Sequence, residues 1–60
     1  MTDKEKLIAL LTEFGIGFSE PEEGHIVTEQ GHSKVEGYGG FFTEFSFDAA
    51  GKFIAMGAYE

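Results

Sequence analysis

Two segments in which side chains alternate in character, residues 41–47 and 52–59, constrain the fold of this chain more than any other feature. Alternation with a period of two is typical of β-strands. Between the segments lie residues 48–51, DAAG. Asp favours the first position of a type I turn, and Gly supplies the left-handed residue that closes a three-residue hairpin loop. We therefore predict a β-hairpin in which residues 41–47 pair with residues 52–59.

The turn also predicts a register, because the hairpin loop pairs Asp48 with Lys52. Phe47 then lies opposite Phe53, and Phe45 lies opposite Ala55. One face of the hairpin is aromatic and is the expected core under a helix: Phe41, Phe45, Phe47 and Phe53. The other face carries Phe42, Glu44, Ile54, Met56 and Ala58.

The N-terminal segment, residues 2–14, has the signals of an amphipathic helix. Thr2 and Glu5 form the T-x-x-E pattern of a capping box. Gly15 follows the segment and can take the left-handed conformation that ends a helix. Four apolar residues at helical spacing form one stripe: Leu7, Leu10, Leu11 and Phe14. We expect this stripe to pack on the aromatic face of the hairpin.

The middle of the chain predicts short strands. Residues 16–19 and 25–29 are expected as strands, separated by a turn at residues 20–24, which contain the only proline. Residues 34–38 form either a short strand or an irregular lead into the hairpin, because nearby glycines weaken a strand. The expected fold is α+β: residues 1–60 form one domain with one helix on one face of a three- to four-stranded antiparallel sheet, in the order α-β-β-(β)-β.

Composition limits the classes of function. The net charge is −7, from eleven acidic residues against four basic ones, which argues against binding to nucleic acid or to an anionic membrane surface. The longest apolar run of the N-terminal segment, residues 7–11, is too short to span a membrane. A cytoplasmic location is therefore expected. The chain has no cysteine, so a domain this small needs a tightly packed core or oligomerisation for stability.

Candidate chemical sites are few. The glycine-rich residues 37–40 are followed by a predicted strand, whereas a phosphate-binding loop requires the start of a helix. His25 and His32 are the only histidines. If a turn centres on residues 30–31, His25 faces Glu36 and His32 faces Glu29 across a hairpin, which could form a His/Glu metal site. Their spacing matches no known motif, and surface histidines are the simpler interpretation. No nucleophile–base arrangement is visible, so we expect neither catalysis nor a cofactor or metal.

Two surfaces remain as candidates for binding. The second hairpin face, with Phe42, Glu44, Ile54, Met56 and Ala58, is a candidate interface that favours a homodimer, unless residues 31–40 fold over it. Three glutamates, Glu20, Glu22 and Glu23, form a candidate acidic patch. This patch is either a solvated surface or the contact site of an acidic inhibitor or nucleic-acid mimic directed at a basic host protein.

Residues 35–60, VEGYGGFFTEFSFDAAGKFIAMGAYE, resemble the C-terminal part of short uncharacterised proteins of tailed bacteriophages and prophages. Those proteins share the pattern G-Y-x-G-F-x-T-E-F-x-F-D-x-x-G-K-F, which is matched here from Gly37 to Phe53. The resemblance implies a phage accessory protein in the cytoplasm of a bacterial host, and it implies no activity. We therefore expect a small acidic non-enzymatic module that acts by protein–protein contact.

Overall fold

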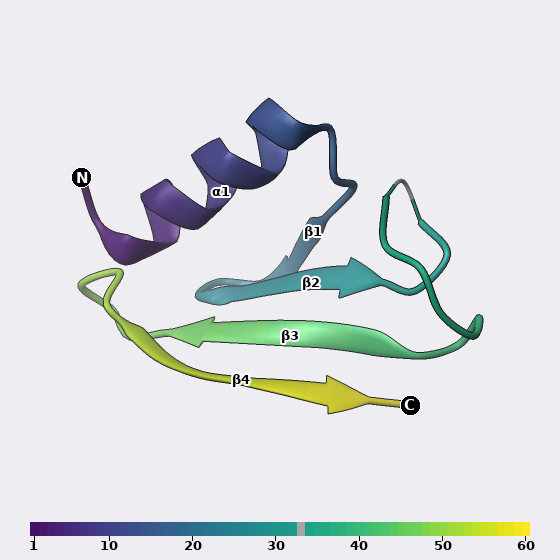
Figure 1. Cartoon of the computed structure of the whole chain (residues 1–60). Coiled ribbons are helices and arrows are strands. Elements are labelled where there is room, and N and C mark those ends of the chain that lie inside the picture. Colours follow the sequence, from purple (N-terminus) through teal and green to yellow (C-terminus); the bar gives the residue numbers. More distant parts are fainter. Residues whose placement is uncertain (33) are drawn as a thin grey trace.

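A computed structural model of the chain describes residues 1–32 and 34–60. Helix α1 (Asp3–Phe14) is followed by strands β1 (Ser19–Glu22), β2 (His25–Glu29), β3 (Phe42–Phe47) and β4 (Phe53–Tyr59) (Figure 1). The four strands form one antiparallel sheet in the order β1-β2-β3-β4. The predicted α+β fold is confirmed, and residues 34–38 take the irregular alternative rather than the strand.

Helix α1 begins and ends at the residues that its capping signals indicate. The hydroxyl of Thr2 accepts a hydrogen bond from the Glu5 N–H at 3.2 Å, and the Glu5 carboxylate accepts one from the Thr2 N–H at 2.8 Å. At the other end, Gly15 is left-handed with φ 71°. The Nζ of Lys34 donates to the Phe14 carbonyl at 2.7 Å, which places a positive charge where the helix dipole is negative.

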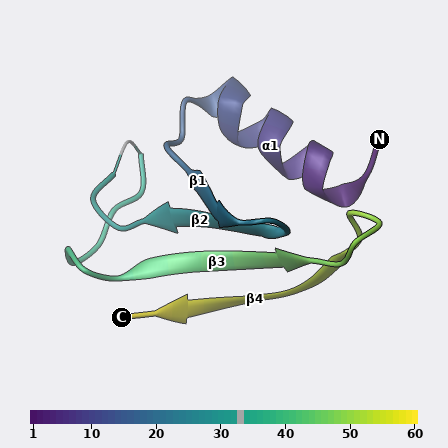
Figure 2. The ribbon, with the colours of Figure 1, turned by 180° about the vertical axis from the view of Figure 1, so that it is seen from behind.

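The core lies between α1 and the middle of the sheet. Leu11 of α1, Ile26 of β2 and Phe47 of β3 are buried together. Partly buried apolar residues surround them: Leu7, Ile8, Ile16, Phe18 and Phe45. In both views of the ribbon, α1 lies on the β1 side of the sheet and β4 lies farthest from it (Figures 1 and 2). The helix therefore covers β2 and β3 and leaves β4 uncovered.

This placement corrects the predicted core. Phe47 is buried and Phe45 packs against the core. Phe41 and Phe53, by contrast, are 39% and 46% exposed. The prediction fails because α1 packs on β2 and β3, with Leu11 against Ile26 and Phe47, rather than on the β3–β4 hairpin alone. The ring of Phe53 instead contacts that of Phe47 edge-on, with centroids 5.9 Å apart.

The predicted register holds at the turn and fails beyond it. The Asp48 N–H donates to the Lys52 carbonyl at 2.9 Å, and Phe47 lies opposite Phe53. The next pair is Ser46 with Ala55, so Ile54 is one extra residue in β4. A β-bulge of this kind shifts every later pair by one residue. Phe45 consequently lies opposite Met56 rather than Ala55.

The first strand also differs from its prediction. The segment Glu20-Pro21-Glu22 was expected in a turn but belongs to β1, which starts at Ser19, and the turn shrinks to Glu23 and Gly24. In the part of the chain that the structure describes, β1 pairs with β2 alone, and this pairing is irregular. Proline is tolerated in such a strand, because a sheet edge or a bulge leaves one N–H without a ladder partner.

Candidate functional site

The two edges of the sheet are built differently. β1 is four residues long, contains Pro21 and two glutamates, and pairs irregularly with β2. Short length, proline, charge and irregular pairing are the features by which proteins protect a sheet edge from further pairing. β4 is seven residues long, with the sequence FIAMGAY, and contains neither proline nor a charged residue; after the bulge at Ile54 its pairing with β3 is regular from Ala55 to Tyr59. The β4 edge is therefore the unprotected edge.

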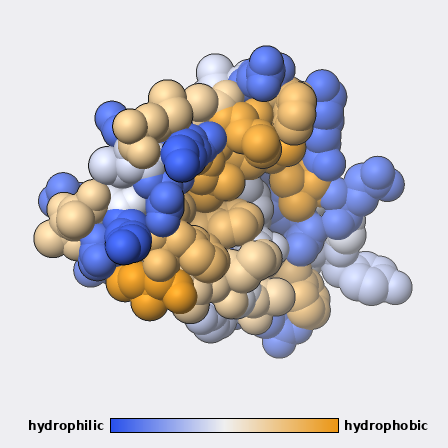
Figure 3. Space-filling model, turned by 60° about the vertical axis from the view of Figure 1, so that its left-hand side comes forward, coloured by the Kyte–Doolittle hydropathy of each residue, from blue (hydrophilic) through white to orange (hydrophobic). Residues whose placement is uncertain are grey.

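Apolar side chains of β4 are exposed along its length. Ile54 and Met56 are 61% and 59% exposed, and Phe53 and Tyr59 are also exposed. Hydrophobic side chains reach the surface low on the molecule, at the level of β4 in Figure 1, as well as at the level of α1 (Figure 3). This exposure follows from the position of α1 over β2 and β3.

The backbone of β4 is also available for pairing. β4 is hydrogen-bonded to β3 on one side, and within residues 1–32 and 34–60 no strand pairs with its outer side. At the start of β4, the Phe53 N–H is already engaged, because it donates to the Asp3 carboxylate at 2.9 Å. Beyond Phe53, the outer edge presents the row of backbone donors and acceptors to which a further strand can add.

The predicted interface residues do not share one face. Phe42 pairs with Tyr59, and Glu44 pairs with Gly57. Met56 and Ala58 pair with Phe45 and Thr43, so they lie on the opposite face of the sheet. The expectation of a single apolar face is wrong because the bulge at Ile54 reverses the side on which later residues of β4 point. Three of the five candidates, Ile54, Met56 and Ala58, still adjoin one another along the exposed strand.

Glu44 gains a structural explanation that the sequence did not suggest. Its Oε2 lies 3.4 Å from Nδ1 of His25, across the β2–β3 ladder. Both side chains are about one third exposed or less, and Nδ1 of His25 makes no hydrogen bond in the described part of the chain. His25 was expected opposite Glu36, because residues 34–38 were considered as the partner strand of β2. β3 is that partner instead.

Tyr59 was not predicted as a site residue, although it packs at one end of the sheet face that carries Phe42 and Glu44. Its ring stacks on that of Phe42, with centroids 5.5 Å apart. It also lies across Gly57, where an added Cβ would come within 2.8 Å of the Tyr59 hydroxyl. Glycine followed two residues later by an aromatic residue in a strand was the signal for this arrangement, because both positions face the same side.

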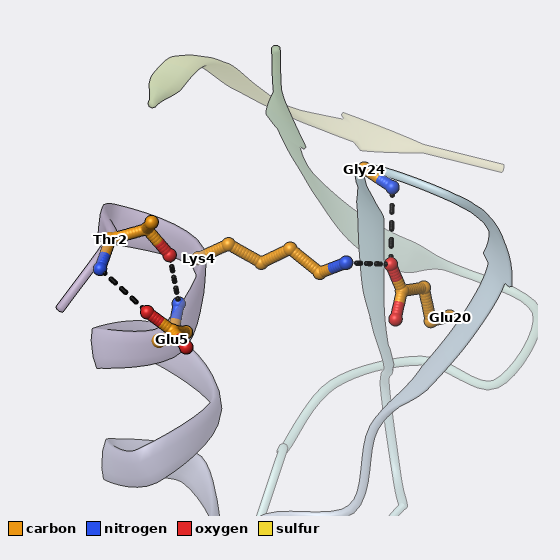
Figure 4. A network of polar contacts seen from close by, with 5 residues as sticks. All are labelled: Thr2, Lys4, Glu5, Glu20 and Gly24. Carbon is orange, nitrogen blue, oxygen red and sulfur yellow. Dashed lines mark hydrogen bonds and ion pairs between the residues drawn. The ribbon is translucent and has the colours of Figure 1, made fainter. Parts of the chain in front are cut away.

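The candidate acidic patch is partly neutralised. Oε2 of Glu20 lies 2.5 Å from Nζ of Lys4 and accepts a hydrogen bond from the Gly24 N–H at 3.1 Å (Figure 4). The lysine contact first, and the backbone contact second, hold the pKa of Glu20 below its usual range. Glu22 and Glu23 remain exposed. Glu20 therefore differs from Glu22 and Glu23, because its contact with Lys4 ties β1 to α1.

The segment 31–40, a possible cover for the hairpin face, contacts α1 through Lys34. Lys34 bonds to the last turn of α1, and Gln30 donates its N–H to the Phe41 carbonyl at 2.9 Å, which closes the loop between β2 and β3. Residue 33, inside the segment 31–40, lies outside the described residues. Ile54 and Met56 stay exposed with this loop in place.

A cleft of about 320 Å³ lies at the start of α1, and two of the charged residues that line it, Lys4 and Asp48, are engaged in structural contacts. Lys4 contacts Glu20, and the Asp48 carboxylate accepts hydrogen bonds from the Ala50 and Lys52 N–H groups at 2.9 Å. Among the described residues, no group of three or more His, Asp or Glu side chains is placed to hold a metal ion. In the same part of the chain, no helix is long and apolar enough to cross a membrane.

Comparisons with protein-family models, with curated proteins and with solved structures found no match. The functional argument therefore rests on the geometry of the chain itself.

Proposed function

We propose that this chain is a small non-enzymatic protein-binding module whose contact surface is the outer edge of β4. The observation that carries the proposal is the contrast between the two sheet edges: β1 is short, acidic and interrupted by Pro21, whereas β4 is long, uncharged and apolar. A strand of a partner that adds to β4 gains main-chain hydrogen bonds, and the exposed side chains of β4 supply apolar contact.

The setting that we propose is a bacteriophage accessory protein in the cytoplasm of its host. The support for it is the resemblance of residues 35–60 to short phage and prophage proteins. Most of the residues that carry this resemblance lie in β3, β4 and the turn between them.

The experiment that tests this function compares capture of proteins by Met56→Lys with capture by the wild-type chain. Met56 lies in the middle of β4 and is 59% exposed, so a lysine there leaves the core intact and adds charge to the edge. Tyr38→Lys is the matched control, because Tyr38 is an exposed apolar residue outside the sheet, 84% exposed. Each immobilised chain is incubated with lysate of infected bacteria.

We expect the wild-type chain and Tyr38→Lys to retain the same protein and Met56→Lys to lose it. Circular dichroism of the three chains verifies that all are folded. Retention of the same protein by Met56→Lys would reject the β4 edge as the contact surface.

An acidic inhibitor or nucleic-acid mimic is the second candidate, and the observation that favours it is the net charge of −7 with Glu22 and Glu23 exposed. This candidate predicts that capture fails steeply as salt rises and that Met56→Lys has no effect. Glu22→Gln combined with Glu23→Gln would then abolish capture. The β4 proposal predicts instead that Met56→Lys abolishes capture and that the Glu22→Gln/Glu23→Gln variant retains it.

A further inference from the structure

We propose that the strand that occupies the β4 edge is β4 of a second copy of this chain, paired antiparallel about a two-fold axis at Met56. This inference rests on the proposed function, because it names the partner of the same edge. An antiparallel pair formed by two identical strands is closed by a two-fold axis, so each copy uses the same surface and no edge of β4 stays open.

Charge singles out β4 as the strand through which two copies can approach. Each chain carries −7, so two copies repel. β1, β2 and β3 each contain at least one glutamate, whereas β4 contains no charged residue. Pairing through β4 therefore keeps the acidic residues of the two copies away from the contact.

The sequence around Met56 is complementary to itself in size. With Met56 opposite Met56 of the second copy, antiparallel pairing places Ile54 opposite Ala58 and Ala55 opposite Gly57. A branched side chain thus meets a small one, and no two large side chains meet except the two Met56. Side chains that lie directly opposite each other are the ones that interact across an antiparallel pair.

The bulge at Ile54 limits how far this pairing extends. The extra residue interrupts the alternation of β4, and the Phe53 N–H already donates to Asp3. The paired segment is therefore residues 54–58, which contains no charged residue. Lys52 and Glu60 lie outside this segment.

The position of α1 leaves room for the second copy. α1 lies on the β1 side of the sheet in both ribbon views, and β4 is the strand farthest from it (Figures 1 and 2). The contact of Asp3 with the Phe53 N–H is at the start of β4, so the free edge extends from Ile54 onward. Joining two such edges continues the sheet through both copies.

Oxidation of single-cysteine variants tests this register directly, because the chain has no cysteine of its own. In the proposed dimer, the two residues at position 56 are directly opposite, with Cβ atoms about 5 Å apart. The two residues at position 58 are separated by four residues along the strand, about 14 Å. Met56→Cys is therefore the test variant, and Ala58→Cys is its matched control on the same exposed strand.

We expect Met56→Cys to form a covalent dimer at least about tenfold faster than Ala58→Cys at micromolar concentration, because pairing holds its thiols at a millimolar effective concentration. Equal rates for the two variants would reject the register. Analytical ultracentrifugation of the wild-type chain supplies the second readout, and a monomer throughout the micromolar range would reject self-pairing.

The outcomes separate this inference from the proposed function. A monomeric wild-type chain whose lysate partner is still lost on Met56→Lys overturns self-pairing and leaves the protein-binding edge in place. If the Met56→Lys variant still dimerises, or still captures the lysate protein, the β4 edge is rejected as the contact surface.

Discussion

Single residues join the layers of this small protein, and Glu20 is the clearest case. Its carboxylate contacts Lys4 of α1 and the Gly24 N–H of the β1–β2 turn (Figure 4). The pKa of Glu20 is lowered in the folded protein from its ordinary value of 4.5. Its contribution to stability is therefore fully present above that value and is lost as the pH falls through the lowered pKa.

We predict that Glu20→Gln lowers the stability of the fold at pH 7 and that the difference from wild type disappears in acid, below the lowered pKa. Urea unfolding at several pH values measures both parts. Glu22→Gln is the control, since Glu22 lies in the same strand and makes no ion pair among the described residues. An equal loss of stability for the two variants would contradict the role of the Lys4 contact.

Glu44 illustrates why some residue contacts could not be predicted from the sequence. A charge within an apolar strand had no local explanation, because its partner, His25, lies in β2. The twelve residues that separate β2 from β3 contain no pattern that fixes how the two strands pair. Contacts within one element, such as the capping box of Thr2 and Glu5, need no such information and were predicted correctly.

At the scale of elements, turns were easier to predict than registers. The hairpin turn was predicted because Asp48 and Gly51 carry its chemistry: the Asp48 carboxylate accepts two backbone hydrogen bonds, and Gly51 has φ 81°. The bulge at Ile54 has no comparable signal, since no glycine or polar residue marks it. One extra residue then moved Met56 to the other face of the sheet and divided the predicted interface.

The β1–β2 turn packs against the end of β3 through Gly24. Its φ is +85°, and an added Cβ would lie 2.8 Å from the Phe47 carbonyl oxygen. Gly31 has nearly the same φ, +80°, and within residues 1–32 and 34–60 no atom lies within 4 Å of an added Cβ. The two glycines therefore differ in the space around them and not in their backbone conformation.

We predict that Gly31→Ala costs about 1–2 kcal/mol of stability, from the left-handed conformation alone. Gly24→Ala should cost about 1–3 kcal/mol more, because the backbone of β3 must shift to accept the methyl group. Urea unfolding of both variants measures the difference. Equal costs would show that Gly24 does not hold the turn against β3.

For the whole molecule, the sequence predicted the elements better than the way they are layered. The helix, the hairpin and the α+β class follow from local signals, whereas the position of α1 depends on β1 and β2. Leu11 and Phe47 pack with Ile26, so α1 is drawn to the middle of the sheet and away from β4. The exposed strand that this leaves could not be inferred from the alternation of the hairpin alone.

Among the described residues, four apolar ones are buried, Leu11, Ile26, Val27 and Phe47, so the stability of a single copy is marginal. If β4 pairs with a second copy, unfolding is coupled to dissociation and the melting temperature rises with protein concentration. We predict a rise of roughly 5–10 °C over a hundredfold increase in concentration for a domain of this size. The Met56→Lys variant should melt at one temperature throughout this range, and Tyr38→Lys should follow the wild type. Differential scanning calorimetry measures all three, and a concentration-independent wild-type melting temperature would contradict coupling between the fold and the β4 edge.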